Sequence, residues 1–195
     1  MALLDWITES AGPVVRGDGV VLKTPRGSDY DAWSRLRRRS YNHLQPWEPL
    51  WPEDDLTRAA FKRRLMVYGR ERELGNAWPF FVFSHEGVLI GAVTLSNVRR
   101  GVAEMGTLGY WIGAPYAGQG HGTAAVKAMV RYAFDALKLH RVDAACVPHN
   151  VASRRALEKA GFVLEGQARA YLKINDEWAD HLLFGIVNDG AAHGG

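Results

Sequence analysis

Cysteine is nearly absent from this chain of 195 residues, with Cys146 as its single example. One cysteine excludes an internal disulfide and a metal site built from cysteines. Cys146 lies in the apolar stretch RVDAACV. We interpret it as a small side chain in a buried strand.

Long hydrophobic runs are also missing. No apolar run reaches the length that a membrane span needs. Residues 1–10 contain Asp5 and Glu9 and lack the basic-then-apolar layout of a signal peptide. We therefore expect a cytoplasmic protein with no membrane partner.

The sequence has no strong excess of one charge. Its 24 Lys and Arg residues nearly balance its 21 Asp and Glu residues, for a net charge of +3. This balance does not demand a nucleic-acid partner, and no aromatic RNA-binding motif is present. Basic residues gather in 35–39 and 62–64, and we interpret both groups as solvated helix faces. The seven histidines form no HxxxH or HExxH pair, so we expect no metal.

We expect one domain, residues 1–195, because its length and apolar content suffice for a single core. Residues 1–18 should form a loosely structured lead-in, and residues 189–195 should fray. Apolar periodicity predicts four helices, at about 29–43, 56–74, 123–137 and 152–160. It predicts seven strands, at 20–24, 78–83, 88–97, 104–112, 141–147, 162–174 and 178–187.

The stretch from Gly109 to Lys138 passes from a strand through a glycine-rich turn into a helix. Glycines let the backbone approach a ligand closely, and a helix start presents unpaired N–H groups. Together they predict a phosphate site. Residues 118–123 lack the lysine of a P-loop and the spacing of a Rossmann fingerprint. The alternative is a tight turn that binds nothing.

A second motif, PHNVASRRALEKAGF, occupies residues 148–162. The two motifs resemble the coenzyme motifs [Q/R]xxGx[G/A] and NxxSxxxxxKxGF of the GNAT superfamily of N-acetyltransferases. The first is matched at Gly120 and Gly122, with Ala117 in place of Gln or Arg. The second is matched at Asn150, Ser153, Lys159, Gly161 and Phe162. The resemblance covers residues 20–187. The segments LQPWEP and YLKINDEWADHLLF resemble the branch that acetylates an N-terminal alanine of ribosomal proteins.

This resemblance implies an α/β (α+β) fold with a mixed central sheet and helices on both faces. A right-handed crossover would join the parallel strands 104–112 and 141–147, which then splay apart. Acetyl-CoA would lie in the gap as the cosubstrate. The residues implied to bind it are Trp111, Ile112, Gly113, Gly118, Gln119, Gly120, His121, Gly122, Thr123, Asn150 and Ser153.

The implied chemistry is acyl transfer to an amine, which must lose a proton before it attacks. Glu104 is the first candidate base, ahead of Glu48 and His149. Ser153 is the candidate donor to the departing CoA thiolate, with Tyr171 as its rival. A helix cap is the alternative role for Ser153.

Three prolines in LQPWEPLWP, residues 44–52, exclude regular helix. Trp47, Glu48 and Trp51 are candidates for binding the acceptor amine. Alternatively, this segment is a connection held in place by its tryptophans, which fill the core.

The expected acceptor is a protein or peptide N-terminus, with a ribosomal protein as the favoured case. Two alternatives stay open: an acetyltransferase for a small amine, such as a polyamine or an antibiotic, and an acetyl-CoA-binding sensor without catalysis. We expect a monomer or a homodimer.

Overall fold

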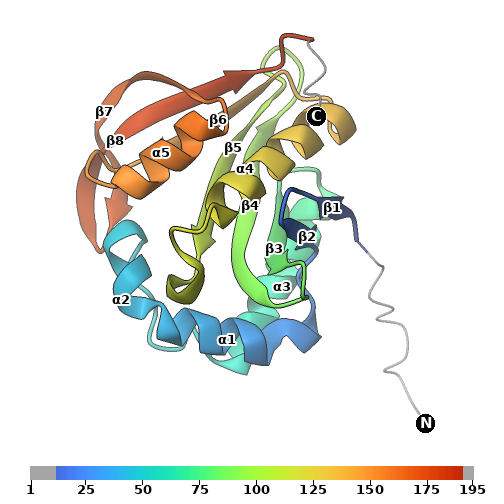
Figure 1. Cartoon of the computed structure of the whole chain (residues 1–195), viewed down its shortest axis with the longest axis vertical. Coiled ribbons are helices and arrows are strands. Elements are labelled where there is room, and N and C mark those ends of the chain that lie inside the picture. Colours follow the sequence, from blue (N-terminus) through green and yellow to red (C-terminus); the bar gives the residue numbers. More distant parts are fainter. Residues whose placement is uncertain (1–11, 191–195) are drawn as a thin grey trace.

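The computed structural model describes residues 12–190, which build one eight-stranded sheet (Figure 1). The order across the sheet is β1-β2-β3-β4-β5-β6-β8-β7. All neighbouring strands are antiparallel except β5 and β6. The strands are β1 Val14–Arg16, β2 Val20–Lys23, β3 Trp78–Ser84, β4 Leu89–Arg99, β5 Met105–Ile112, β6 Arg141–Cys146, β7 Val163–Ile174 and β8 Glu177–Val187.

Helices cover both faces of this sheet, as predicted. In Figure 1, α4 and α5 cross the near face and α3 lies behind the sheet. The α-helices are α1 Tyr30–Arg39, α2 Tyr41–Leu44, α3 Arg58–Glu73, α4 His121–Arg131 and α5 Val151–Lys159. A π-helical turn, Tyr132–Ala136, extends α4.

The central strands are apolar on both faces because both faces are covered. In β3, Phe80 and Val82 belong to the core under α4, whereas Phe81 and Phe83 pack with Trp33 of α1 on the opposite face. Successive side chains of a strand point to opposite faces, so one aromatic run serves two cores.

The parallel pair splays apart, as the resemblance implied. Its register runs from Met105 opposite Arg141 to Leu108 opposite Ala144 and goes no further. Beyond that point β6 stays paired with β8, through Cys146 opposite Leu182. The last four residues of β5, 109–112, therefore lack a strand partner on that edge.

Several predicted boundaries were wrong. The expected lead-in contains β1, because Val14–Arg16 pairs with β2. The expected helix 29–43 is broken at Ser40, whose buried Oγ accepts a hydrogen bond from the Ala114 N–H at 2.9 Å. The expected helix 56–74 begins at Arg58, because the Thr57 side chain caps it by accepting from the Ala60 N–H. The expectations for residues 1–11 and 191–195 lie outside the described residues.

Other expectations were confirmed. The hairpin of β3 and β4 and the final hairpin of β7 and β8 both form. The final hairpin turns at Asn175 and Asp176, which both adopt positive φ, at 47° and 69°. Such angles match the turn types that suit the twist of paired strands. Segment 45–52 contains only a 3-10 turn, Gln45–Trp47, followed by irregular chain.

Candidate active site

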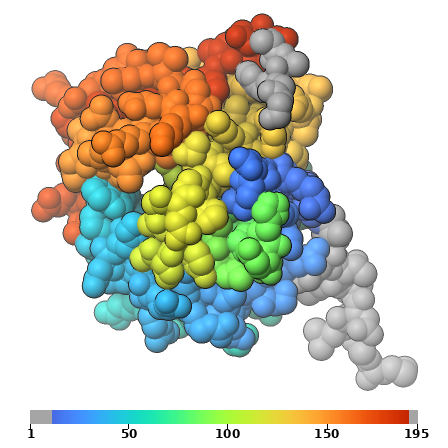
Figure 2. All heavy atoms as spheres, viewed as in Figure 1, coloured from blue at the N-terminus to red at the C-terminus, as the bar shows by residue number. Residues whose placement is uncertain are grey.

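A cavity of about 410 Å³ opens where β5 and β6 separate. Figure 2 shows the surface hollowed between α2 (cyan), α4 (yellow) and α5 (orange). The cavity is lined by the end of β5, the glycine turn, one side of α5 and the segment from His43 to Glu48. The glycine turn predicted to bind phosphate and the segment predicted to bind the acceptor amine are far apart in sequence, yet both line this cavity.

The glycine turn forms the floor of this cavity. Gly118 and Gly120 adopt φ of 74° and 86°, a left-handed conformation that favours glycine. Gly120 is the N-cap residue of α4, and no side chain caps the helix. The N–H groups of the first turn are thus available to an anion, and the helix dipole favours negative charge there.

Gly122 is needed for space rather than for its backbone angle. A Cβ at this position would lie 3.3 Å from Cε2 of Tyr110 and 3.6 Å from Cγ1 of Ile112. The glycine therefore lets α4 begin close against β5. Of the predicted coenzyme ligands in this turn, Gly118, Gly120, Gly122 and Thr123 line the cavity, whereas Gln119 and His121 do not. The Gln119 side chain turns back to the carbonyl of Pro115 at 3.1 Å.

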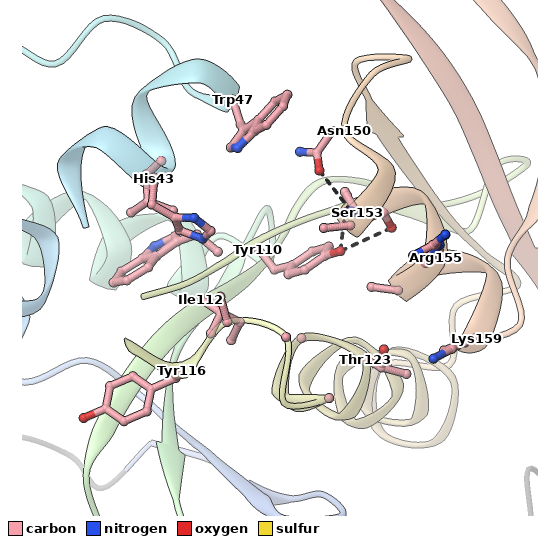
Figure 3. Close-up of a pocket in the computed structure, with 18 of the residues that line it drawn as sticks. His43, Trp47, Tyr110, Ile112, Tyr116, Thr123, Asn150, Ser153, Arg155 and Lys159 are labelled. Carbon is pink, nitrogen blue, oxygen red and sulfur yellow. Dashed lines mark hydrogen bonds between the residues drawn. The ribbon is translucent and has the colours of Figure 1, made fainter. Parts of the chain in front are cut away.

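Arg155 and Lys159 line the same end of the cavity from α5 (Figure 3). They lie four residues apart, so one helix face carries both. Sequence reasoning missed both as site residues, although Lys159 matched the second motif. Two cations and a helix N-terminus together make this end suited to a polyphosphate.

The open edge of β5 provides peptide-like hydrogen-bonding groups. The Gly113 N–H donates to the Ile90 carbonyl of β4 at 2.9 Å. In an antiparallel strand the backbone groups alternate between the two edges. The N–H and C=O groups of Tyr110 and Ile112 therefore face the gap, whereas those of Trp111 and Gly113 face β4. The backbone role predicted for residues 111–113 fits Ile112 and does not fit Trp111 or Gly113.

A small hydrogen-bonded cluster lies at the centre of the cavity (Figure 3). The hydroxyl of Tyr110 lies 3.2 Å from Oγ of Ser153. Oδ1 of Asn150 accepts from the backbone N–H of Ser153 at 3.0 Å. Asn150 is therefore the N-cap of α5, which leaves the Ser153 hydroxyl free of the capping role. Burial raises the pKa of Tyr110, so its hydroxyl is neutral at pH 7.

Cys146 lies beside this cluster and is buried, as predicted. Burial raises the pKa of its thiol, an effect partly opposed by a hydrogen bond with Ser153. The side chain is therefore a neutral thiol at pH 7.

Glu104 does not reach the cavity. It precedes β5 at the end opposite Ile112, about 26 Å away at the usual strand rise of about 3.3 Å per residue. Its carboxylate pairs with Arg100 at 3.0 Å and accepts from the Gly101 N–H at 2.8 Å. These hydrogen bonds lower its pKa. The positioning of Glu104 beside the thioester was wrong, because a residue early in β5 is carried away from the splayed end.

Tyr171, the rival candidate for donating to the CoA thiolate, is not among the residues that line the cavity. It is exposed on β7 and packs against His181, with ring centroids 5.8 Å apart. It does not line the cavity, whereas Tyr110 does. Tyr110 is the tyrosine that sequence reasoning missed. Its signal was its place in GYWI, directly before the glycine turn.

The segment of residues 44–52, which we call the acceptor segment, forms the opposite wall. Trp47 and Glu48 line the cavity, and the Trp47 ring packs against His149 with centroids 5.2 Å apart. Glu48 is not free to meet a cation from outside. Its two oxygens accept from Nη1 and Nη2 of Arg37, both at 2.8 Å, and one also accepts from Nε1 of Trp51. The expected cation partner of Glu48 is thus Arg37 of the same chain.

The family model described as "Acetyltransferase (GNAT) domain" matches residues 20–163. The chain belongs to this acetyltransferase family. The GNAT protein is 35% identical to the [ribosomal protein uS5]-alanine N-acetyltransferase of Escherichia coli over 162 residues, which cover 82% of this chain and 84% of that one. It is 32% identical to the probable N-acetyltransferase YjcK of Bacillus subtilis over 90% of this chain and 97% of that one.

A solved structure of the same family has a similar fold. Mycobacterium smegmatis RimJ in complex with CoA-disulfide superposes with a TM-score of 0.86 and is 31% identical, covering 92% of this chain and 88% of that chain. These similarities establish the GNAT protein as an acetyl-CoA-dependent N-acetyltransferase.

Two observations on the described residues concern metal binding and membrane insertion. Within 12–190, no group of three or more His, Cys, Asp or Glu side chains is placed to hold a metal ion. In the same part of the GNAT protein, no helix is long and apolar enough to cross a membrane.

Proposed function

We propose that this enzyme moves an acetyl group from acetyl-CoA to the α-amine of a protein N-terminus, with an alanine of a ribosomal protein as the acceptor. The observation that carries the proposal is the open edge of β5 at residues 109–112, which leads from an anion-binding helix start into the cavity. The identity to the E. coli alanine acetyltransferase supports this acceptor. If its acceptor is a ribosomal protein, the enzyme acts in the cytoplasm.

The cavity has groups that suit both the diphosphate and the amide-containing arm of acetyl-CoA. The diphosphate would lie on the N–H groups at the start of α4, with Arg155 and Lys159 beside it. The amide-containing arm would pair with the gap-facing groups of Tyr110 and Ile112, as an added strand does. Ala117 replaces the Gln or Arg of the motif without loss of this site, because the backbone of the turn supplies the donors.

Transfer begins when the amine nitrogen attacks the thioester carbon. The carbonyl oxygen becomes an oxyanion, and a gap-facing N–H such as that of Ile112 would stabilise it by about 3 kcal/mol. When the C–S bond breaks, the Ser153 hydroxyl would donate to the thiolate. Tyr110 would hold Ser153 in place and supply a second neutral hydroxyl nearby.

The amine needs little help to lose its proton, since an α-amine has a pKa near 8. Glu104 is too distant for this task, and the carboxylate of Glu48 is already paired with Arg37. Among the remaining side chains that line the cavity, His43 carries a ring that can accept a proton. We propose His43 as the group that receives it, directly or through water.

The test is CoA release with matched peptides, one with a free N-terminal alanine and one with the same sequence and a blocked N-terminus. Release only with the free peptide supports the proposal. Release with polyamines and not with peptides would replace it with the small-amine alternative. That alternative finds little support in the cavity, because its acid, Glu48, is neutralised by Arg37. Mass spectrometry of ribosomal protein N-termini, with and without the gene, then identifies the acceptor.

A further inference from the structure

Arg37 of α1 is a buried arginine that no step of acetyl transfer proposed above uses. Its side chain is 8% exposed, and its guanidinium is charged at every physiological pH. Arginines this deeply buried are almost always paired. Arg37 does not line the cavity where β5 and β6 separate, here named the reaction cavity. Any effect of Arg37 on the reaction must therefore pass through the residues that it contacts.

The first of these contacts is with the wall of the reaction cavity. Nη1 and Nη2 of Arg37 both donate to the carboxylate of Glu48, at 2.8 Å each. Glu48 lines the reaction cavity, as does Trp47 directly before it. A paired bond of this kind fixes the orientation of a carboxylate as well as its position. Arg37 therefore controls a residue of the cavity wall from outside the cavity.

The guanidinium of Arg37 also lies over the rings of two tryptophans. Its central carbon is 3.8 Å from the ring centroid of Trp51 and 5.0 Å from that of Trp111. Trp51 belongs to the acceptor segment, and Trp111 belongs to β5. The face of an aromatic ring attracts a cation. Arg37 thus links the acceptor segment to the strand whose open edge would bind the arm of acetyl-CoA.

Glu48 is held by two further hydrogen bonds. Its Oε2 accepts from Nε1 of Trp51 at 2.8 Å. Its carbonyl accepts from the Asn175 N–H of the final hairpin at 3.0 Å. Within residues 45–52 the only regular structure is the 3-10 turn Gln45–Trp47. The course of this part of the chain therefore depends on contacts with its neighbours, and most of the side-chain contacts converge on the pair of Arg37 and Glu48.

The side of the cavity that this pair supports is the side open to the acceptor. In Figure 3, Trp47 lies beyond the Tyr110–Ser153 cluster, on the side away from Thr123 at the start of α4. The coenzyme phosphates would occupy the α4 end, so the acceptor amine approaches from the side of Trp47. An amine reacts only when it is held about 3–3.5 Å from the carbon that it attacks. A small displacement of this wall therefore weakens acceptor binding and spares the coenzyme end.

We propose that Arg37 is a positioning residue for the acceptor. Through Glu48 it fixes Trp47 and the acceptor wall relative to the open edge of β5, and so it sets how well the acceptor binds. This inference rests on the proposed function, because it requires a peptide N-terminus between Trp47 and β5. Lysine cannot take this role, because an ammonium offers neither the paired bonds to Glu48 nor a flat face to the tryptophan ring.

The test compares Arg37→Lys with the unchanged enzyme. Steady-state kinetics with a peptide that has a free N-terminal alanine give kcat and the peptide KM, and calorimetry gives the affinity for acetyl-CoA. We expect the peptide KM to rise about tenfold or more, with kcat changing less and the acetyl-CoA affinity staying within about twofold. The variant keeps a cation beside Glu48, so no buried charge is left unpaired.

Arg64→Lys is the matched control. Arg64 also pairs with a carboxylate, that of Asp55 at 2.5 Å, and its guanidinium carbon lies 4.9 Å from the ring centroid of Trp33. Neither Arg64 nor Asp55 lines the reaction cavity. This variant loses the same kind of paired bond on the same face of the sheet, yet it should keep the peptide KM. It separates positioning from a general loosening of that face.

If Arg37→Lys fails to fold, the double variant Arg37→Met with Glu48→Met answers the question. Apolar residues can replace a buried ion pair without loss of stability. Its Tm should therefore lie near that of the unchanged enzyme, while the peptide KM stays raised, because methionines make no directed bonds. A role in stability alone predicts instead that a normal Tm is accompanied by a normal KM.

The outcomes separate the two proposals. If the unchanged enzyme acetylates no free N-terminus, the proposed function fails. If it does so and Arg37→Lys keeps the peptide KM, the inference is overturned while the function stands. The same conclusion follows if Arg64→Lys raises the KM equally, if the acetyl-CoA affinity falls as far as the KM rises, or if the double variant has a normal KM.

Discussion

Ser153 shows how the role of one residue depends on its neighbours. Its place near the start of α5 would suit a capping serine, yet Asn150 occupies the cap position. Its hydroxyl is therefore directed to Tyr110 within the cavity. A side chain without a structural task at this position is suited to act on the leaving group.

We predict that Ser153→Ala lowers kcat at least tenfold and leaves the affinity for acetyl-CoA nearly unchanged. The hydroxyl interacts with the sulfur only as the C–S bond breaks, so its loss affects the transition state more than the bound state. Steady-state kinetics and calorimetry measure the two quantities. An unchanged kcat would remove Ser153 from the mechanism. Stability should also persist, since the cap belongs to Asn150.

We predict that Tyr110→Phe lowers kcat several-fold, with a small effect on the affinity for acetyl-CoA. The ring remains to pack in the cavity wall, while the hydroxyl that positions Ser153 at 3.2 Å is lost. Tyr132→Phe is the control, because Tyr132 packs against Phe80 outside the cavity and should keep full activity. Equal kcat values for the two variants would count against a positioning role for Tyr110.

At the scale of elements, the junction of β5 and α4 determines where the coenzyme can bind. Gly120 ends the turn in a left-handed conformation and starts the helix, and Gly122 brings the helix against Tyr110 and Ile112. The free N–H groups, the open strand edge and the hydroxyl cluster therefore lie within one short stretch of structure. Moving α4 away from β5 would separate them.

We predict that Gly122→Ala weakens acetyl-CoA binding several-fold, measured by calorimetry. The added Cβ would lie 3.3 Å from the Tyr110 ring, so the helix start or the ring must shift. Gly69→Ala in α3 is the matched control, because no atom lies within 4 Å of its added Cβ. That variant should bind normally and gain about 0.5–1 kcal/mol of stability, since alanine favours helix over glycine. Identical affinities for both variants would refute the packing argument.

At the scale of the whole molecule, the gap between β5 and β6 results from how several strands pair and not from one strand alone. β6 diverges from β5 because it remains paired with β8 through Cys146. The tip of the same β7–β8 hairpin reaches back to the acceptor segment, where the Asn175 N–H donates to the Glu48 carbonyl at 3.0 Å. The final hairpin thus supports the segment that carries Glu48, which forms one wall of the site.

An ion pair across three strands makes stability depend on pH. Arg141 of β6 donates to Glu165 of β7 over Gly185 of β8, where a Cβ would meet both side chains. The hydrogen bond from Arg141 lowers the pKa of Glu165. A lowered pKa in the folded state means that the unfolded chain binds the proton more tightly. This contribution is therefore present at neutral pH and is lost as the pH falls below about 4.3.

We predict that Glu165→Gln lowers the Tm modestly at pH 7. Between pH 5 and pH 3, a range that spans the usual carboxyl pKa of about 4, the Tm of the variant should fall less steeply than that of the unchanged protein. The effect should be small because Glu165 is exposed and solvent screens the pair. Glu177→Gln, on the neighbouring strand β8, is the control and should follow the unchanged protein. A Glu165 variant with an unaltered pH profile would contradict the assignment.

The sequence predicted more of the elements than of the site. Its apolar periods located every strand except β1, which is three residues long and too short to show a pattern. The helix break at Ser40 was not predicted, and the group that binds the Ser40 side chain there, the Ala114 N–H, lies 74 residues away in sequence. In the site, the glycine turn and Ser153 were found from motifs. Glu104 and Tyr171 were chosen as chemically suitable residues, and no local pattern shows that their side chains stay outside the cavity.

The sequence by itself determined the glycine turn and the presence of a helix after each of the two motifs. These depend on backbone angles and hydrogen bonds between residues a few positions apart, which local residue types control. Only the tertiary structure decided that Tyr110 meets Ser153, that Arg37 neutralises Glu48 and that Glu104 lies far from the gap. Those relations depend on strand register and on packing between distant segments, and the free energy of such contacts becomes available only when the sheet and its helices have assembled.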